Sequence, residues 1–127
     1  MSRNTKDEFI KYIKIGYCKK ENNMKRLFIS QPMSGLTAEK IAEQRQIAVE
    51  QAKELVCDDI EVIDTIYKDF SEDVNPLIYL SRAIADLSTA DLVFFAKGWE
   101  VSRGCKIEHA CAVEYNIPVI YYNKSEC

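Results

Sequence analysis

Four short apolar segments alternate with helical patterns along this chain, and that alternation limits the possible folds more than any other feature. Predicted strands lie at 25–30, 60–64, 91–96 and 117–122, and a predicted helix follows each of the first three. Strands that are joined through helices form parallel sheets with right-handed crossovers. The near-continuous apolar segment at 91–96 is typical of a strand covered on both faces.

The sequence therefore predicts an α/β fold of three layers, a Rossmann- or flavodoxin-like open parallel sheet of four to five strands with helices on both faces. Thr37 is the predicted N-cap of a helix that runs to Val56. Pro76 opens a second helix, and a third ends near Tyr115. The predicted apolar positions of the second helix are Leu77, Leu80, Ile84 and Leu87.

Residues 24–127 are the predicted compact domain. The lysine-rich segment 1–23 is predicted to be an N-terminal appendage, for which a short amphipathic helix is one interpretation. The net charge of −3 gives no electrostatic reason to expect nucleic acid or a membrane surface as a partner. No apolar segment approaches the roughly 20 residues of a membrane span.

The cysteines are five in number, without a CxxC pair, and are expected to be free thiols in the cytoplasm. A single histidine without clustered partner ligands predicts no metal site.

Ligands of open α/β sheets bind beyond the carboxyl ends of the strands. Two predicted loops lie there, at 31–36 and 97–104. In the first, Ser34 and Gly35 can offer a hydroxyl and backbone N–H groups to an anion or a sugar, and a plain turn is the other interpretation.

The second loop leads into a helix through Ser102, a good N-cap residue, and Gly104, which permits close approach to the backbone. Glu108 then falls within the first two helical turns. The positive end of the helix dipole is expected to keep this carboxylate ionised, as a nucleophile requires. The alternative is an ordinary helix residue that the dipole favours.

The stretches "LFISQPMSGL" and "ADLVFFAKGWEVSRGCKIEHACAVEYNIPVI", with the spacing between them, resemble the nucleoside 2-deoxyribosyltransferase-like superfamily over residues 25–121. They are most similar to a small branch whose first loop reads SGPMTG and whose second reads GWxxSxGAxxE. The superfamily also contains 2'-deoxynucleoside 5'-phosphate N-hydrolases. The resemblance implies that the glutamate matching Glu108 attacks the anomeric carbon of a 2-deoxyribose, so that the base leaves and a covalent glycosyl-enzyme forms.

The resemblance also implies substrate-binding roles for other positions. Ser102 stands where phosphate-using hydrolases have a serine, with Arg103 as a neighbouring cation. Gln31 replaces a glycine of the relatives, and Ala83 replaces an aspartate that handles the leaving base, for which Asp86 is the expected substitute. Trp99 is expected to stack on a base or sugar, or to act as a lid or dimer contact. The complete implied substrate-binding set is Ser30, Gln31, Met33, Ser34, Gly35, Asp86, Trp99, Ser102, Arg103 and Gly104.

The leading hypothesis is therefore cleavage or transfer of the N-glycosidic bond of 2'-deoxynucleosides or their 5'-monophosphates, without a metal or organic cofactor. A homodimer or larger homo-oligomer is expected, because relatives complete their sites with residues of a neighbouring subunit. One alternative is a module that binds or senses a nucleotide without turning it over, for which Gln31 and Ala83 argue. Another is an interaction protein that presents the segment 1–23 to a partner.

Overall fold

The computed structural model describes residues 24–71 and 73–123, so the predicted appendage at 1–23 lies outside the described residues. The described chain alternates strands and helices in the predicted order. Its elements are β1 (Met24–Ser30), α2 (Ala38–Leu55), β2 (Asp59–Val62), α3 (Pro76–Leu87), β3 (Leu92–Phe95), the 3₁₀ turn η1 (Trp99–Val101), α4 (Arg103–Glu114) and β4 (Val119–Tyr121).

The four described strands form one open parallel sheet in the order β2-β1-β3-β4. The central strands β1 and β3 pair with Leu27 opposite Leu92 and Ile29 opposite Phe94. Every pairing is parallel, so all carboxyl ends lie at the same edge of the sheet. The predicted α/β fold is confirmed.

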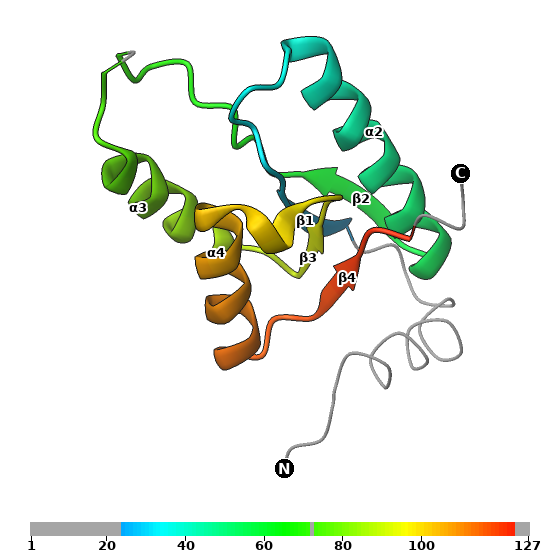
Figure 1. Ribbon diagram of the computed structural model, residues 1–127. Helices are drawn as coiled ribbons and strands as arrows, with labels where there is room; N and C mark the ends of the chain where they lie inside the picture. Colours follow the sequence, from blue (N-terminus) through cyan, green and yellow to red (C-terminus); the bar gives the residue numbers. More distant parts are fainter. Residues whose placement is uncertain (1–23, 72, 124–127) are drawn as a thin grey trace.

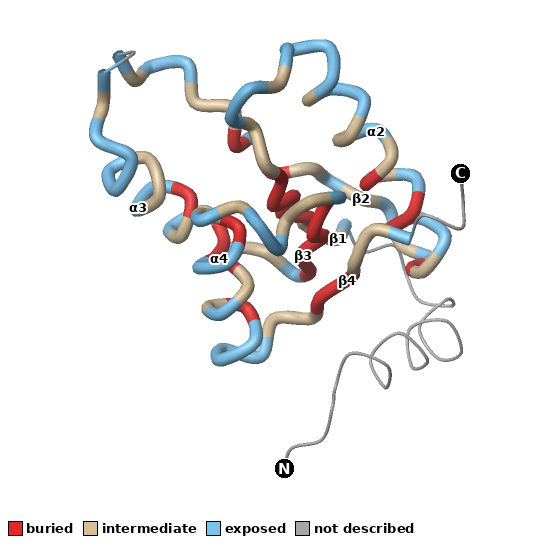
Figure 2. The backbone as a smooth tube through the Cα atoms, in the orientation of Figure 1, coloured by how far each residue is buried: buried red, intermediate tan, exposed pale blue. Residues whose placement is uncertain are grey.

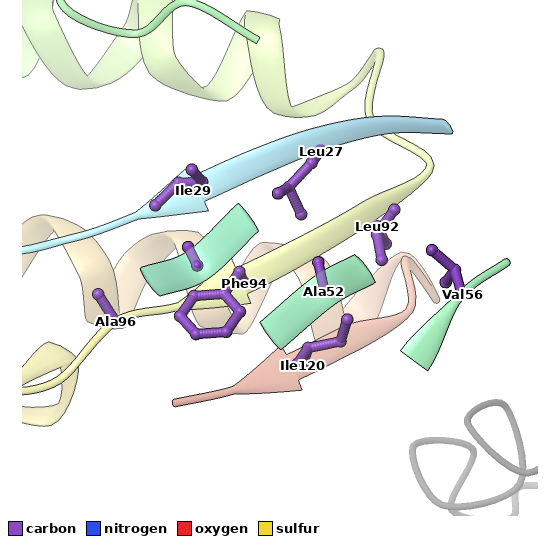
Figure 3. Packing of buried hydrophobic residues seen from close by; sticks show 9 residues of the cluster. Leu27, Ile29, Ala52, Val56, Leu92, Phe94, Ala96 and Ile120 are labelled. Carbon is purple, nitrogen blue, oxygen red and sulfur yellow. The ribbon is translucent and has the colours of Figure 1, made fainter. Parts of the chain in front are cut away.

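Helices cover both faces of the sheet, with α2 on one side and α3 and α4 on the other (Figure 1). Side chains alternate along a strand, so each central strand contributes to two cores. On the α2 face, Leu27 and Ile29 pack with Phe94 of β3 and with Ala52 and Val56 near the end of α2 (Figure 3). On the other face, the buried side chains are Phe28, Ile63, Ala83, Leu87, Val93, Phe95, Ala112 and Val119. The most deeply buried segments are the central strands and the helix faces that meet them (Figure 2).

The helices begin where side chains cap them. Thr37 Oγ1 accepts a hydrogen bond from the amide of Lys40 at 3.1 Å, and Asn75 Oδ1 accepts one from the amide of Leu77 at 2.8 Å. Thr37 is the predicted cap, and Pro76 is the predicted first residue of α3.

The burial of α3 differs from the prediction. Leu77 is 68% exposed, whereas Ala83 and Leu87 are the buried residues of this helix. The reason is that α3 packs on the sheet through its carboxyl-terminal turns, while its first turn projects beyond the strand ends.

Two of the five cysteines, Cys105 and Cys111, are free thiols. Cys57 is disulfide-bonded, so the expectation of free thiols is wrong at this position. Disulfide formation depends on the distance between two Cβ atoms in the fold, which cysteine spacing alone does not reveal. Within the part of the chain that the structure describes, no helix has both the length and the apolar character needed to cross a membrane.

Candidate functional site

A cavity of about 1030 Å³ opens beyond the carboxyl ends of the strands. Its walls come from four parts of the chain: the loop after β1, the segment after β2, the helix α3, and the region from η1 into α4. Phe28 and Ile29 of β1 also line the cavity. Both predicted ligand loops therefore reach the same cavity.

Glu108 lies in the second turn of α4 and lines this cavity although it is only 9% exposed. Ser30 Oγ, at the end of β1, donates a hydrogen bond to Glu108 Oε1 at 2.6 Å. Ser30 follows Phe28 on the sheet face that α4 covers, and this alternation brings the hydroxyl to the carboxylate. Among the described residues, no lysine or arginine forms an ion pair with Glu108. The carboxylate is thus held by one neutral donor.

Burial raises the pKa of Glu108 to about 6, and the hydrogen bond from Ser30 partly opposes that rise. Loss of hydration therefore has a larger effect on this carboxylate than the expected stabilisation by the helix start. The field of a helix end fades within the first turn, and Glu108 is the sixth residue of α4, where loss of hydration has the larger effect. At neutral pH, a pKa of about 6 still leaves most of the carboxylate ionised.

The start of α4 forms a polar wall beside Glu108. Ser102 caps the helix, and its Oγ accepts a hydrogen bond from the amide of Cys105 at 3.4 Å. A Cβ placed on Gly104 would meet no atom within 4 Å, so this glycine leaves open space against the helix backbone. The exposed cations Arg103 and Lys106 also line the cavity. Backbone amides of a first helical turn and two nearby cations suit an anionic group.

The loop after β1 closes the opposite side with Gln31, Met33 and Ser34. Gln31 is buried, and its Oε1 accepts a hydrogen bond from Arg45 at 2.9 Å. Arg45 also donates to Thr65 Oγ1 at 3.3 Å, which links the loops that follow β1 and β2. Gly35 adopts a left-handed backbone with φ of 79° but is outside the cavity lining.

The third wall is aromatic and was not predicted. Tyr67, Phe70 and Tyr79 line the cavity and pack edge to face or at a tilt, with ring centroids 5.2 to 5.8 Å apart. The connection from β2 to α3 shows no clean hydrophobic periodicity, so its sequence alone predicted neither a helix or strand nor a functional role. Two signals were available: it begins at the carboxyl end of a parallel strand, and at 13 residues it is long for a loop in a compact domain.

Asp86 is outside the cavity lining, and its carboxylate accepts a hydrogen bond from the hydroxyl of Tyr67. Ala83, where relatives were expected to carry an acid, does line the cavity. Burial, followed by the hydrogen bond to Asp86, raises the pKa of the Tyr67 phenol. The predicted substitute for the missing acid therefore reaches the cavity wall only through Tyr67.

Trp99 is also outside the lining. Its ring lies 4.3 Å from that of His109 and 5.7 Å from that of Tyr121, measured between centroids. His109 Nε2 lies 2.7 Å from the hydroxyl of Tyr121, so this histidine, which follows Glu108 on the helix, is directed towards β4 and away from Glu108. Trp99 thus belongs to an aromatic cluster between η1, α4 and β4.

Comparison with known proteins bears on the fold and the family. No curated protein matches the sequence. One solved structure that does match is described as a conserved protein from Enterococcus faecalis V583, with a TM-score of 0.50 and 18% identity. The match covers 78% of this chain and 63% of that one, so this chain spans less than two thirds of the other's length. At this identity the likeness concerns the fold alone. A family model matches residues 25–121, which include every residue of the cavity wall and all of the described strands except Met24 of β1. The chain therefore belongs to the family described as a domain of unknown function, DUF4406.

Proposed function

We propose that this protein cleaves or transfers the N-glycosidic bond of 2'-deoxynucleosides or their 5'-monophosphates, with Glu108 as the nucleophile. One observation carries the proposal: a buried carboxylate that lines a cavity, is hydrogen-bonded by the neutral Ser30, and forms no ion pair with any lysine or arginine of the described residues. An unpaired carboxylate remains able to form an ester. The similarity to the nucleoside 2-deoxyribosyltransferase-like superfamily supplies the substrate class.

In the proposed reaction, a Glu108 carboxylate oxygen attacks C1' of the deoxyribose. The bond from C1' to the base nitrogen breaks, and its electron pair leaves with the base, which takes up a proton. Water or a second base then attacks C1' and releases the carboxylate. The positive charge that develops on the sugar favours an ionised Glu108, as in retaining glycosidases.

The polar wall at the start of α4 is proposed to hold the sugar or its 5'-phosphate. Ser102 is neutral and would not repel a phosphate as a carboxylate would, while Arg103 and the amide of Gly104 lie at the same wall. Ser34 is proposed to approach the substrate from the opposite loop. Ser30, beneath Glu108, is proposed to position the nucleophile and not to contact the sugar.

The decisive experiment compares wild-type protein with Glu108→Gln. The proteins are incubated with deoxynucleosides and deoxynucleoside 5'-monophosphates, with and without an acceptor base, and products are separated by chromatography. We expect base release or exchange by the wild type and a loss of at least about 1000-fold in the variant, because the covalent route is closed. Absence of base release from every substrate, or equal release by the variant, contradicts the proposal.

A second function is favoured by one observation. Glu108 is the one carboxylate among the described residues of the cavity wall, and Ala83 supplies no acid to the leaving base. General acid catalysis typically contributes about 100-fold or more. A nucleotide-binding module without turnover is therefore the alternative, and binding by calorimetry without product formation would establish it.

Assembly into a homodimer or larger homo-oligomer also belongs to the proposal. Val101, which lines the cavity, is 85% exposed, and Leu77 in the first turn of α3 is 68% exposed. A second subunit that covers such side chains would also close the cavity. Sedimentation equilibrium measures the assembly state directly, and a monomer at assay concentrations contradicts this part.

A further inference from the structure

The wall of the cavity is divided into two chemically different halves. The half built by the loop after β1 and the start of α4 carries Glu108, serine hydroxyls and two cations. The half built by the segment after β2 and by α3 is mainly apolar and aromatic, formed by Tyr67, Phe70, Val74, Pro76, Tyr79, Leu80 and Ala83. A ligand that fills both halves needs one polar or anionic end and one flat apolar end.

The aromatic half is a cluster of interlocking rings. Tyr67 meets the rings of Phe70 and Tyr79 edge to face, Phe70 and Tyr79 meet at a tilt, and all three remain half-buried at the cavity. Arg82 reinforces the cluster: its guanidinium carbon lies 4.4 Å from the centroid of the Tyr67 ring, and Nη1 contacts both carboxylate oxygens of Asp69 at 2.8 and 2.9 Å. Such a cluster offers stacking and edge contacts to a flat ring.

Tyr67 also determines which hydrogen-bonding group the aromatic half offers to a ligand. Its hydroxyl proton is donated to the carboxylate of Asp86. The phenol oxygen therefore keeps only lone pairs for a ligand, so it acts as a hydrogen-bond acceptor there. An N–H donor on the ligand is favoured at this oxygen, and a carbonyl oxygen is disfavoured.

We propose that the aromatic cluster of Tyr67, Phe70 and Tyr79 is the nucleobase subsite, and that the Asp86-bound oxygen of Tyr67 selects bases with an amino group over those with a carbonyl at the same position. This inference rests on the proposed function for the orientation of the substrate: Glu108 and the start of α4 take the sugar side. The base then lies against the segment after β2. Asp86 acts through Tyr67 as a positioning residue and does not contact the base.

The test measures equilibrium binding to the Glu108→Gln protein, which leaves the probes intact, by titration calorimetry. The probes are dCMP and dUMP, dAMP and dIMP, and 2-deoxyribose 5-phosphate. Within each nucleotide pair, an amino group is exchanged for a carbonyl. We expect the amino-bearing member to bind about 10-fold more tightly, and to bind at least 10-fold more tightly than the sugar phosphate.

Three further substitutions in this background separate ring contact from hydrogen bonding. Tyr67→Phe keeps the ring, and we expect it to remove the preference for the amino-bearing base. Phe70→Leu and Tyr79→Leu are expected to weaken nucleotide binding about 10-fold and to leave sugar phosphate binding unchanged. Tyr115→Leu is the matched control, because Tyr115 is 79% exposed and outside the cavity wall. Circular dichroism verifies that each variant is folded.

The inference is overturned by equal binding of nucleotides and sugar phosphate, or by an amino preference that survives Tyr67→Phe. Equal weakening of nucleotide and sugar phosphate binding by both leucine variants also overturns it. None of these measurements requires turnover. A protein that binds nucleotides through this cluster but releases no base would refute the proposed reaction and leave the subsite established.

Discussion

The two faces of the sheet are built from the same strands but end differently. On the α2 face, the core residues of β1 are Leu27 and Ile29, and those of β3 and the position after it are Leu92, Phe94 and Ala96, all of them apolar. On the face of α3 and α4, the apolar core stops at Phe28 and Phe95, and the next inward position on β1 is Ser30, bound to Glu108. The α2 face is called the sealed face below, because Ile29 alone among its core residues reaches the cavity lining, and the face of α3 and α4 is called the open face, because it opens into the cavity.

This difference shows which face of the sheet can hold a reactive side chain. A sealed apolar layer contributes stability through packing and offers no reactive group. A buried carboxylate with one neutral donor is unfavourable for stability, since its charge is poorly solvated. Such costs are typical of functional sites, where stability is exchanged for reactivity. The substitutions below act on one face or the other, and their effects should therefore separate.

The largest expected change in stability comes from the sealed face. Phe94 is fully buried against α2, so Phe94→Ala should lower the free energy of unfolding by about 3–5 kcal/mol, through lost burial and an unfilled cavity. Urea denaturation measures the change. Tyr115→Ala is the control, because Tyr115 is 79% exposed, and we expect it to cost less than about 0.5 kcal/mol. Similar losses for both variants would show that α2 does not seal this face.

Substitutions on the open face should change activity more than stability. Ser30→Ala removes the hydroxyl that donates to Glu108 and holds its pKa down, so the pKa of Glu108 should rise further. The acidic limb of the profile of kcat/KM against pH should then move to higher pH. A hydrogen bond to a charged group is worth about 1.5–3 kcal/mol, so the ionised fraction of Glu108 at pH 7, and with it kcat/KM, should fall by about 2- to 15-fold. Ser30→Thr retains the hydroxyl and should recover much of the rate. An unchanged pH profile would show that Ser30 does not control the carboxylate.

The sequence was sufficient to predict the sealed face. Short apolar segments between helical patterns predicted the strands. Thr37 and Pro76 marked helix starts within one residue of those observed. These signals are local: a cap, a proline and a hydrophobic period act within a few residues of themselves. The same local signals placed the loops after β1 and β3 at the carboxyl ends of the strands, where the cavity lies.

The rest of the cavity depends on contacts between distant segments. The aromatic wall joins residues after β2 with residues of α3, and no periodic pattern links Tyr67 to Tyr79. Trp99 was expected either to stack on a ligand or to act as a lid or dimer contact, and the 3₁₀ turn directs it towards His109 and Tyr121, outside the cavity lining. The raised pKa of Glu108 likewise follows from burial by the whole fold, which its position near a helix start does not disclose.

A smaller effect tests the cost of the buried charge. The folded-state pKa of Glu108 is about 6, above its ordinary value of 4.5, so ionisation of this residue weakens the fold as pH rises from about 4.5 through 6. Glu108→Gln removes the charge and should stabilise the protein at pH 7 by up to about 2 kcal/mol. The gain should vanish near pH 4, where the wild-type residue is protonated. Denaturation at both pH values measures this, and a variant less stable than the wild type at pH 7 contradicts it.

The smallest effect compares the caps of the two helices on opposite faces. Thr37→Ala removes the hydrogen bond to the amide of Lys40 at the start of α2 and should cost about 1 kcal/mol of stability without changing base release. Ser102→Ala removes the equivalent cap of α4 and should cost a similar amount, since Ser102 bonds the amide of Cys105. Ser102 also lines the cavity, so its substitution should in addition weaken substrate binding, seen as a higher KM. If the two variants lose stability alike and only Ser102→Ala changes KM, the cap on the open face has a second role that the cap on the sealed face lacks. If both leave KM unchanged, the polar wall at the start of α4 does not hold the substrate.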